Sequence, residues 1–397
     1  MAGRRRKSGP NIVFTILGFV VVGILGLIYT LTGRAPTGSF SGTDTPVIDT
    51  PTVVVSAVPP TSTVASDWWE VYFTDPVNMG NPEQWQGSVE AQLINKINNA
   101  QRTIHIASFE FDLTQVAEAL IAAKQRGVEI LWVTDDEHGL EADEEPGHGQ
   151  FAMLRAAGIE VRSDTRSALM HNKFWIFDWQ TVWTGSTNIT ENGIFDQNNN
   201  VLVIHSPEVA AIYETEFQEM WNGQFGPRSP SQILDQSANI NGSQILVIFT
   251  SEDKALETAI IPFVLGAQSS VYFMAFSFTD YPLAAAMIQR RNSGVEVAGV
   301  FEAFGSTTDA AELRTLFCGS VPVRQDGNGG FLHHKLIVVD ERYVITGSLN
   351  FSTNAETSND ENVIIIDNTE IAQLYIQEFE RVWALGKDVD PAKMVCQ

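Results

Sequence analysis

The sequence contains very little cysteine. Only Cys318 and Cys396 occur among 397 residues, and neither belongs to a CxxC pair or to a cysteine–histidine cluster. Structural zinc is therefore not indicated. The two thiols could form a disulfide outside the cytoplasm or remain unrelated, and the sequence leaves both options open.

Positive charge is also scarce. The chain has 24 Lys and Arg against 48 Asp and Glu, a formal net charge of −24. Residues 1–66 hold five basic and two acidic side chains, so they contribute +3 and the remaining chain carries −27. Such a surface repels polyanions at long range, which argues against indiscriminate nucleic-acid binding without excluding a local positive pocket. With 44% hydrophobic residues, the chain is expected to be globular.

A long apolar run occurs at the N-terminus. Four basic residues at 4–7 precede an uncharged, mostly apolar run at 12–32, and Arg34 follows. About 20 residues at ~1.5 Å each span a hydrocarbon core of ~30 Å, and the basic cluster should stay cytoplasmic. We expect residues 1–34 to contain a transmembrane signal anchor that places the rest of the chain outside the cytoplasm. The alternative is a cleaved signal peptide, which would release a secreted protein.

The rest of the chain begins with a spacer and then repeats one pattern. Residues 35–66 are rich in Thr, Ser and Pro, which is typical of an extended spacer. Segment 104–111 (IHIASFEF) reappears as 271–278 (VYFMAFSF), and each copy is followed by a helical stretch, Gly-Val-Glu and an apolar strand. This order predicts an α/β fold of two tandem sandwich repeats. The predicted helices are 116–126 and 283–292, the strands after them are 130–133 and 297–301, and the repeats are 67–228 and 244–397 with a boundary in 226–242.

Each repeat contains the same set of polar residues. They are His171, Lys173, Asp178 and Gly-Ser-Thr-Asn at 185–188 in the first repeat, and His333, Lys335, Asp340 and Gly-Ser-Leu-Asn at 347–350 in the second. In both copies Lys lies two residues after His, Asp seven, Gly fourteen and Asn seventeen. A single copy could be a core histidine beside a surface lysine. Two copies at the same place in a repeat are not plausibly chance.

Strand geometry explains the spacing. His and Lys two residues apart on a strand project from the same face. The four apolar residues after Lys form a buried strand that Asp ends, and a return strand at 181–184 or 343–346 brings the Gly-Ser-x-Asn segment back. Glycine allows close approach to an anion, and neighbouring side chains donate hydrogen bonds. The predicted phosphate-binding residues are Ser186, Asn188, Ser348 and Asn350.

These residues resemble the two HKD motifs of the phospholipase D superfamily, and the second repeat is also similar to that superfamily's bacterial endonucleases. The resemblance implies a phosphodiesterase that needs neither metal nor cofactor, with a phosphohistidine intermediate and two halves related by a pseudo-twofold axis. One imidazole attacks phosphorus, and the other donates a proton to the leaving oxygen. The lysines and asparagines stabilise the equatorial oxygens.

One position breaks the symmetry of the two repeats. Glu361 lies fourteen residues after Gly347, whereas Asn199 occupies the same place after Gly185. In the family, a carboxylate near this position orients the histidine of the opposite half. We therefore expect Glu361 to orient His171 as the nucleophile, with His333 as the general acid and base. Asp178 and Asp340 complete the catalytic set as supports rather than proton donors.

An acidic segment, a further histidine and three tryptophans lie near the motifs in the sequence. The acidic segment 135–148 is predicted to be a solvated loop near the pocket rim rather than a metal site, and His334 should point away from the pocket. Trp175, Trp179 and Trp183 are expected to pack around the first motif, although an exposed tryptophan could enter lipid headgroups. We expect a phospholipid substrate at a membrane surface. The alternatives are a metal-independent endonuclease acting on DNA or RNA, a cardiolipin synthase-like phosphatidyltransferase, and a degenerate binding module.

Overall fold

The computed structural model describes residues 64–229, 231, 233 and 235–396. The predicted membrane segment and nearly all of the predicted spacer lie outside these residues. Within the described part of the chain, no helix is both long enough and apolar enough to cross a bilayer.

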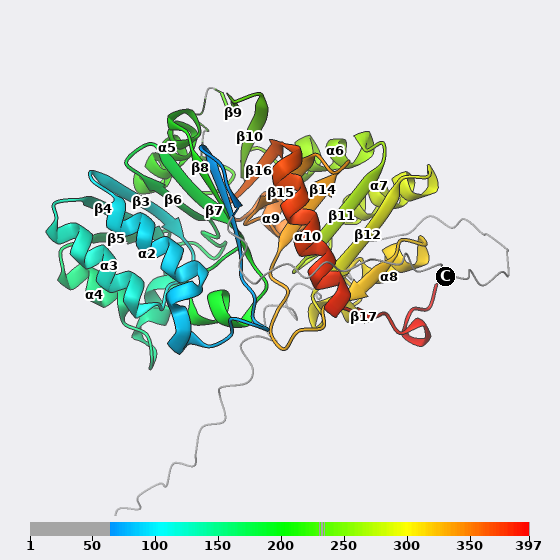
Figure 1. Cartoon of the computed structure of the whole chain (residues 1–397), viewed down its shortest axis with the longest axis horizontal. Coiled ribbons are helices and arrows are strands. Elements are labelled where there is room, and N and C mark those ends of the chain that lie inside the picture. Colours follow the sequence, from blue (N-terminus) through cyan, green and yellow to red (C-terminus); the bar gives the residue numbers. More distant parts are fainter. Residues whose placement is uncertain (1–63, 230, 232, 234, 397) are drawn as a thin grey trace, which may run out of the picture. The chain divides into compact units, whose positions relative to one another are not determined.

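The first half of the described chain is built on a mixed sheet of eight strands (Figure 1). Its strand order is β1-β2-β8-β7-β6-β3-β4-β5, and all neighbours are antiparallel except the parallel β3-β4-β5 edge. The strands are β1 (Val64–Ala65), β2 (Trp69–Phe73), β3 (Thr103–Ser108), β4 (Glu129–Thr134), β5 (Glu160–Ser163), β6 (Lys173–Phe177), β7 (Thr181–Gly185) and β8 (Asn200–His205). The helices are η1 (Pro82–Gly87), α2 (Val89–Asn99), α3 (Thr114–Gln125), η2 (Asp136–Glu141), η3 (Ala142–Glu144), α4 (Gln150–Ala156), η4 (Asn192–Asp196) and α5 (Pro207–Trp221).

The second half repeats this plan in a sheet of nine described strands, ordered β17-β13-β12-β11-β14-β15-β16-β10-β9. The strands are β9 (Ser237–Ile240), β10 (Ser243–Thr250), β11 (Ser270–Ala275), β12 (Glu296–Phe301), β13 (Val323–Gln325), β14 (Lys335–Val339), β15 (Tyr343–Gly347), β16 (Glu361–Asp367) and β17 (Lys387–Asp388). The helices are η5 (Leu256–Ile260), α6 (Ile261–Gly266), α7 (Tyr281–Asn292), η6 (Gly305–Thr307), α8 (Leu313–Cys318), α9 (Thr353–Thr357), α10 (Thr369–Leu385) and η7 (Pro391–Lys393).

The predicted mixed α/β fold is therefore confirmed. The predicted helices correspond to α3 and α7, and the strands after them to β4 and β12. Strand β1 pairs with β2, so the first sheet begins before residue 67. Strand β9 pairs with β10, so the second sheet begins inside the predicted linker.

Two long helices join the halves through a shared core. Helix α5 contacts β3, β4, β6 and β7 of its own sheet and also β9, while α10 contacts β11, β12, β14 and β15 and also β2. Their apolar faces and the inner faces of both sheets form one hydrophobic cluster, and both sheets lie within one compact unit. The outer faces pack separately, under α2–α4 on the first sheet and under α6–α8 on the second (Figure 1).

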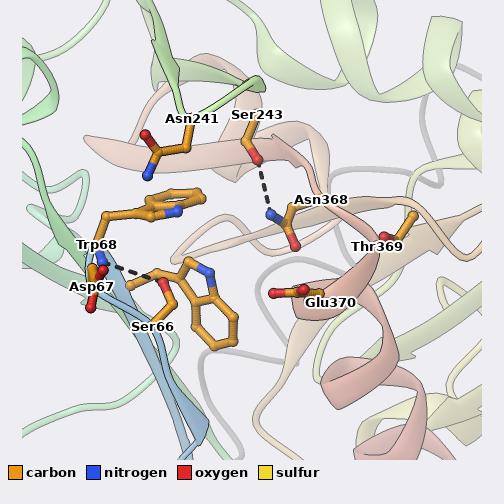
Figure 2. Close-up of a pocket in the computed structure, with 9 residues that line it drawn as sticks. Ser66, Asp67, Trp68, Asn241, Ser243, Asn368, Thr369 and Glu370 are labelled. Carbon is orange, nitrogen blue, oxygen red and sulfur yellow. Dashed lines mark hydrogen bonds between the residues drawn. The ribbon is translucent and has the colours of Figure 1, made fainter.

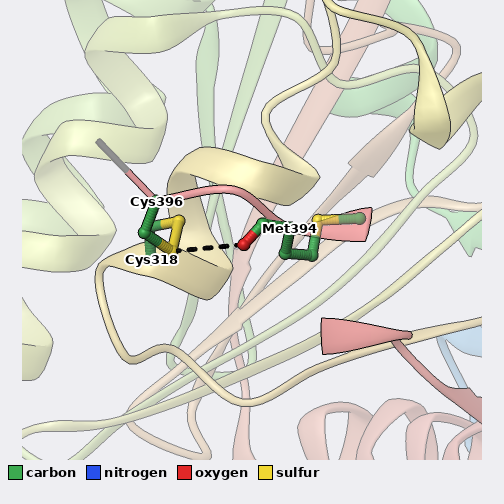
Figure 3. Close-up of a disulfide and its surroundings, with 3 residues drawn as sticks. All are labelled: Cys318, Met394 and Cys396. Atoms are coloured by element: carbon green, nitrogen blue, oxygen red, sulfur yellow. Dashed lines mark hydrogen bonds between the residues drawn. A yellow bond between two sulfur atoms is a disulfide. The ribbon is translucent and has the colours of Figure 1, made fainter. Parts of the chain in front are cut away.

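The two cysteines are paired. Cys318 at the end of α8 forms a disulfide with Cys396, 78 residues later (Figure 3). The bond ties the C-terminal segment to the second half of the fold. This resolves the choice that the sequence left open.

Candidate active site

The two His-x-Lys motifs enter equivalent hairpins. Strands β6 and β14 begin at the motif lysines and are completely buried, as their aromatic and β-branched sequences KFWIF and KLIVV favour. Each runs antiparallel to the next strand, β7 or β15. The turns between them place two consecutive residues at positive φ, 54° and 57° in the first and 54° and 52° in the second. Each turn is closed by a backbone hydrogen bond of 3.0 Å, from Gln180 N–H to the Phe177 carbonyl or from Arg342 N–H to the Val339 carbonyl, and three residues connect the paired strands.

A glycine at the end of each return strand is sterically required. Gly185 and Gly347 have φ values of 146° and 145°. A Cβ at either position would collide with a backbone carbonyl, that of Asn200 or that of Asn362. The glycine therefore lets the return strand lie close against its neighbour, which explains its fixed distance from the histidine.

Backbone hydrogen bonds between the halves bring the two motifs together. The His171 amide donates to the Asp360 carbonyl, and the His333 amide donates to the Asn198 carbonyl, each at 2.9 Å. Both histidines are 6% exposed. The first motif is thus held by the residue before β16, and the second motif by the segment before β8. The two imidazoles share one electrostatic environment.

The orienting partner of each imidazole also comes from the opposite half. His171 Nδ1 lies 2.7 Å from Glu361 Oε2, and His333 Nδ1 lies 2.9 Å from Asn199 Oδ1. The predicted contact of Glu361 with His171 and the amide partner of His333 are both present. The asymmetry between the repeats is therefore a real difference in the chemistry around the two histidines.

The hydrogen bonds fix the tautomer of both rings. Glu361 can only accept from His171 when ionised. Asn199 donates through Nδ2 to the Gly193 carbonyl, which turns Oδ1 toward His333. In each neutral ring Nδ1 therefore carries the proton and Nε2 the lone pair. Neither Nε2 atom has a hydrogen-bond partner within the described residues.

Buried positive charge flanks both imidazoles. Lys173 Nζ donates to the His171 carbonyl and Lys335 Nζ to the His333 carbonyl, each at 2.8 Å. Burial, followed by the two lysine charges, lowers the pKa of each histidine well below its ordinary value. Burial also lowers the pKa of Lys173 to about 8. An anion that enters this site would relieve the repulsion among the two lysines and the two histidines.

Glu361 is a buried acid whose ionisation falls near neutrality. Burial raises its pKa to about 7, and the Lys173 charge opposes that rise. Its second oxygen accepts from Asn359 Nδ2 at 3.0 Å. The carboxylate therefore has donors on both sides when it is charged.

The predicted phosphate ligands divide into two groups. Ser186 and Ser348 are fully buried, and their hydroxyls accept the backbone N–H groups of Asn200 and Asn362 at 3.1 and 3.0 Å. These contacts brace the strands, and the positive φ of the glycine before each serine turns the hydroxyl toward the neighbouring strand.

The two asparagines stay candidates for phosphate binding. Asn350 Oδ1 is buried and has no hydrogen-bond partner in the described part of the chain, and Asn188 Nδ2 donates to Glu110 at 2.8 Å. The Asn188 amide group keeps a second hydrogen for a ligand.

The motif aspartates do not lie at the imidazoles, which corrects their place in the predicted catalytic set. Asp178 is five residues beyond Lys173, about 16 Å along a strand with a rise of ~3.3 Å per residue. Its carboxylate accepts the backbone N–H groups of residues 101–103 at 2.6–3.0 Å. Asp340 accepts those of residues 268–270 at 2.7–3.1 Å, and these donors outweigh burial and lower its pKa. Both aspartates anchor the loop that leads into β3 or β11.

Two phenylalanines of the site were missed in the sequence. The ring of Phe109 lies 4.8 Å from that of His171, and the ring of Phe276 lies 4.7 Å from that of His333. Each ring also lies 4.9 Å from the Nζ of the motif lysine. The signal was present, since both occupy the same place in the repeated segments 104–111 and 271–278.

The acidic segment contributes a third histidine near the pocket. Asp135 is 1% exposed and accepts the Met170 N–H at 3.1 Å. His138 Nδ1 lies 3.1 Å from Asp135, which raises the pKa of this histidine, and its ring lies 4.9 Å from Phe109. His138 thus lies beside the ring that packs on His171, and Asp135 is buried rather than solvated.

The rim on the His333 side is aromatic. Phe331 packs 5.9 Å from Phe276, and Phe304 packs 5.8 Å from Phe331. Phe331 is 40% and Phe304 73% exposed. Rings therefore lead from the protein surface to His333 without interruption. We call Phe304 and Phe331 the aromatic rim.

The remaining predicted side chains lie away from the pocket. His334 is buried and faces Asn200 and Glu378 at 3.0 and 3.1 Å, as its expected direction requires. Trp175 and Trp183 are buried in the core, whereas Trp179 is 44% exposed in the hairpin turn.

A separate hollow of about 380 Å³ lies beside Trp68 and Trp69 (Figure 2). Asn368 Nδ2 donates to Ser243 Oγ across it at 2.9 Å. Strand β2 pairs Trp69 with Ile204 at this end and Phe73 with Asn200 at the other. The histidines belong to the Asn200 end, so this hollow is not part of their site.

The sequence is similar to a known protein family and to characterised relatives. The family described as "Cardiolipin synthase, PLD-like domain" matches residues 93–221 and again residues 260–383. A mitochondrial cardiolipin hydrolase from Mus musculus is 35% identical over 130 residues, which cover 33% of this chain and 58% of that protein. A phospholipase D from Rickettsia conorii is 34% identical over 113 residues, covering 28% of this chain and 56% of that protein. The chain thus spans less than two thirds of the length of these relatives.

A solved structure has the same fold over most of the described chain. The phosphatidylserine synthase from Haemophilus influenzae Rd KW20 superimposes with a TM-score of 0.61 at 14% identity, covering 83% of this chain and 89% of that one. The two family matches each contain one His-x-Lys motif and together span more than half of the sequence. The chain therefore belongs to the phospholipase D-like superfamily.

Proposed function

We propose that the chain is a phospholipase D-type phosphodiesterase that hydrolyses phospholipids through a covalent phosphohistidine. One observation carries the proposal. Two buried imidazoles from different repeats each present an unprotonated Nε2 that has no partner within the described residues, beside two buried lysines. This arrangement suits a nucleophile and a proton-transfer group acting on one anionic phosphodiester.

In the first half-reaction, His171 Nε2 attacks phosphorus and the bond to the leaving alcohol oxygen breaks. His333, which becomes protonated when the anionic substrate enters, gives its Nε2 proton to that oxygen. The attacked imidazole becomes positively charged, and Glu361 on its Nδ1–H stabilises that charge. The ammonium groups of Lys173 and Lys335 stabilise the negative charge on the equatorial oxygens.

In the second half-reaction, water attacks the phosphorus of phosphohistidine and His333 Nε2 accepts a proton from it. The nitrogen–phosphorus bond breaks, and its electron pair returns to His171. The products are the free alcohol and a phosphomonoester lipid, and both histidines end in their starting protonation states. An alcohol in place of water would give phosphatidyl transfer, and the description of the matched family names a cardiolipin synthase.

The assignment of roles to the histidines can be tested with leaving groups. The full chain in detergent micelles is assayed on an aryl phosphodiester, whose phenolate leaves without protonation, and on an alkyl phosphodiester, whose alkoxide does not. We expect His333→Ala to lose much more activity on the alkyl than on the aryl substrate, while His171→Ala loses both equally. The opposite pattern, or phosphate trapped on residue 333, would exchange the two roles.

A lipid substrate is supported by the aromatic rim and by the charge of the chain. Exposed phenylalanines beside His333 suit the interfacial or acyl region of a lipid layer, and aromatic side chains favour that environment. The net charge of −24 and the acidic segment near His171 disfavour a long polyanion. The names of the relatives, cardiolipin hydrolase and phospholipase D, agree with this choice.

The substrate test compares lipid with nucleic acid in EDTA. The full chain is incubated with vesicles of phosphatidylcholine and cardiolipin and, separately, with single-stranded DNA and RNA. We expect phosphatidic acid release that is lost in His171→Ala and reduced in the double variant Phe304→Ser/Phe331→Ser. The same double variant should keep its activity on a soluble aryl phosphodiester. Cleavage of nucleic acid without lipid turnover would replace the proposed substrate by DNA or RNA.

We also propose that residues 1–34 anchor the enzyme and that its catalytic part lies outside the cytoplasm. The basic cluster before the apolar run and the Cys318–Cys396 disulfide both support this topology, since disulfides persist in oxidising compartments. Protease treatment of intact cells tests it. The catalytic part should be degraded from outside, and full protection would refute the orientation, whereas its appearance in the medium would indicate cleavage.

A further inference from the structure

Two buried glutamates and a half-buried third converge at a place that the proposed reaction does not use. Glu216 and Glu219 lie three residues apart on α5, and Glu252 follows β10 in the second repeat. One carboxylate oxygen of each lies within 4.8 Å of those of the other two. An ion at the centre of these three oxygens lies at most about 2.8 Å from each, so shifts of a few tenths of an ångström bring all three to a Ca²⁺–oxygen distance of ~2.4 Å.

Glu216 is aimed into this cluster without a partner for its charge. The residue is 3% exposed, and its Oε2 is buried with no hydrogen-bond donor among the residues that the structure describes. The charged groups that act on it are Glu252, Asp360, Glu219 and Asp253, all of them acids. Arg166, the nearby base, is bound to Asp360 and Asp164. A buried carboxylate in such surroundings is costly unless a cation or a proton joins it.

In the second repeat, the glutamate equivalent to Glu216 is paired with a cation. Glu378 on α10 lies 162 residues after Glu216, the offset that also relates the two motif histidines. It accepts from Arg381 at 2.7 and 2.8 Å and faces His334 at 3.1 Å. Arg381 also lies 3.6 Å from Asp75, a residue of the opposite repeat. A guanidinium thus links carboxylates from both halves of the fold.

In the first repeat both bases are replaced. The position of Arg381 is taken by Glu219, and the position of His334 by Asn172, an uncharged residue that accepts a hydrogen bond from Asn362. Glu252 brings a third carboxylate from the opposite repeat, as Asp75 does on the other side. The cluster around Glu378 therefore contains its own cation, Arg381, whereas the equivalent cluster around Glu216 contains two acids of the first repeat and one of the second.

We propose that Glu216, Glu219 and Glu252 form a structural binding site for a divalent cation of the Ca²⁺ type, which replaces the guanidinium of Arg381 and joins the two repeats. Oxygen ligands alone select hard cations, and three carboxylates offer up to six oxygens. The site is separate from the catalytic histidines. Its ion stabilises the fold and takes no part in the proposed reaction.

The experiment uses the full chain in detergent micelles after removal of metal with EDTA and dialysis at pH 7.5. Calcium and magnesium chloride are titrated to about 10 mM, roughly tenfold above the weak end of protein Ca²⁺ affinities (~1 mM), by calorimetry, and thermal unfolding is followed in parallel. We expect one Ca²⁺ bound per chain and a rise in Tm of about 5 °C at a hundredfold excess over Kd. Initial rates on an aryl phosphodiester at 25 °C should be the same in EDTA and in Ca²⁺.

Two variants and one control locate the site. Glu216→Gln should weaken Ca²⁺ binding at least about tenfold, since one of three charged ligands is lost. Glu219→Arg copies the second repeat, so it should abolish the Ca²⁺ effect and raise the Tm measured in EDTA. Asp136→Asn changes a different acidic group, beside Asp135 and Asp164, and should bind Ca²⁺ like the wild type. Absence of binding in the wild type, normal binding in Glu216→Gln, or loss in Asp136→Asn would each overturn the proposal.

Discussion

Replacing Glu361 with glutamine should separate the two histidines functionally. The side chain keeps its shape, but its two oxygens face donors on both sides, His171 Nδ1–H at 2.7 Å and Asn359 Nδ2 at 3.0 Å. A glutamine must point its NH₂ group at one of them. If it faces His171, the ring is driven to the other tautomer, and Nε2 loses the lone pair that attacks phosphorus.

The magnitude follows from the lost charge. A hydrogen bond to a charged group contributes about 1.5–3 kcal/mol, which corresponds to a loss in kcat of roughly 10- to 150-fold before any change of tautomer. The pH dependence adds a second signature. Because burial raises the pKa of Glu361 to about 7, the carboxylate becomes protonated as the pH falls below that value, and wild-type kcat/KM should fall with it.

The assay measures kcat and kcat/KM of the full chain on an aryl phosphodiester between pH 5 and 9, with thermal unfolding to confirm that each variant is folded. Glu361→Gln should lose both the rate and this acidic limb. Asn199→Asp, which changes the equivalent partner of His333, should keep the limb. If Glu361→Gln retained activity within about twofold and the same pH profile, Glu361 would not act on the nucleophile.

Three further outcomes are expected. Asp178→Asn should lower the free energy of unfolding by about 2–3 kcal/mol through its weakened backbone hydrogen bonds, yet leave kcat of the folded enzyme unchanged, as denaturant titration and kinetics would reveal; a selective loss of kcat would place Asp178 in the reaction. Reducing the Cys318–Cys396 disulfide should cost roughly 4 kcal/mol, judged from the chain entropy of a 78-residue loop, and a Tm unchanged by reductant would contradict this. Glu361 and Asp360 have pKa values raised by burial to about 7 and about 6, so their folded forms bind protons more tightly than their unfolded forms. Their stabilisation is complete below about pH 4 and is lost as the pH rises through 6 and 7, so in EDTA the Tm at pH 5.5 should exceed that at pH 7.5, and a reversed order would be inconsistent with buried neutral acids.

Much of the site was predictable because its parts follow one another along the chain. The strand, the hairpin and the return strand of each motif need only local spacing, and their bounds matched closely. The contact between Glu361 and His171 joins residues 190 apart, and it was foreseen because the internal repeat aligned Glu361 with Asn199 and the family supplied the cross-repeat partner. An internal repeat thus conveys some three-dimensional information that a single copy would not.

What the sequence did not predict depends on side-chain direction and on packing between the repeats. Ser186 follows a glycine at positive φ, which turns its hydroxyl into the strands, and spacing alone does not show that reversal. Phe304 and Phe331 are 27 residues apart and meet only through the fold. The Glu216 cluster combines a helix of one repeat with a loop of the other, so its acids look unremarkable in the sequence.

Each repeat supplies the side chain that orients the histidine of the other repeat. This arrangement affects how the two repeats can come to differ in sequence. In a dimer of identical subunits, any substitution appears on both sides of the twofold axis, so both histidines would receive a carboxylate or both an amide. Covalent linkage of the copies removes that restriction, and each half can change alone. Glu361 opposite Asn199, and Glu219 opposite Arg381, are differences that a dimer of identical subunits could not encode. The fused chain can therefore place different groups beside its two imidazoles, at a site that takes residues from both halves.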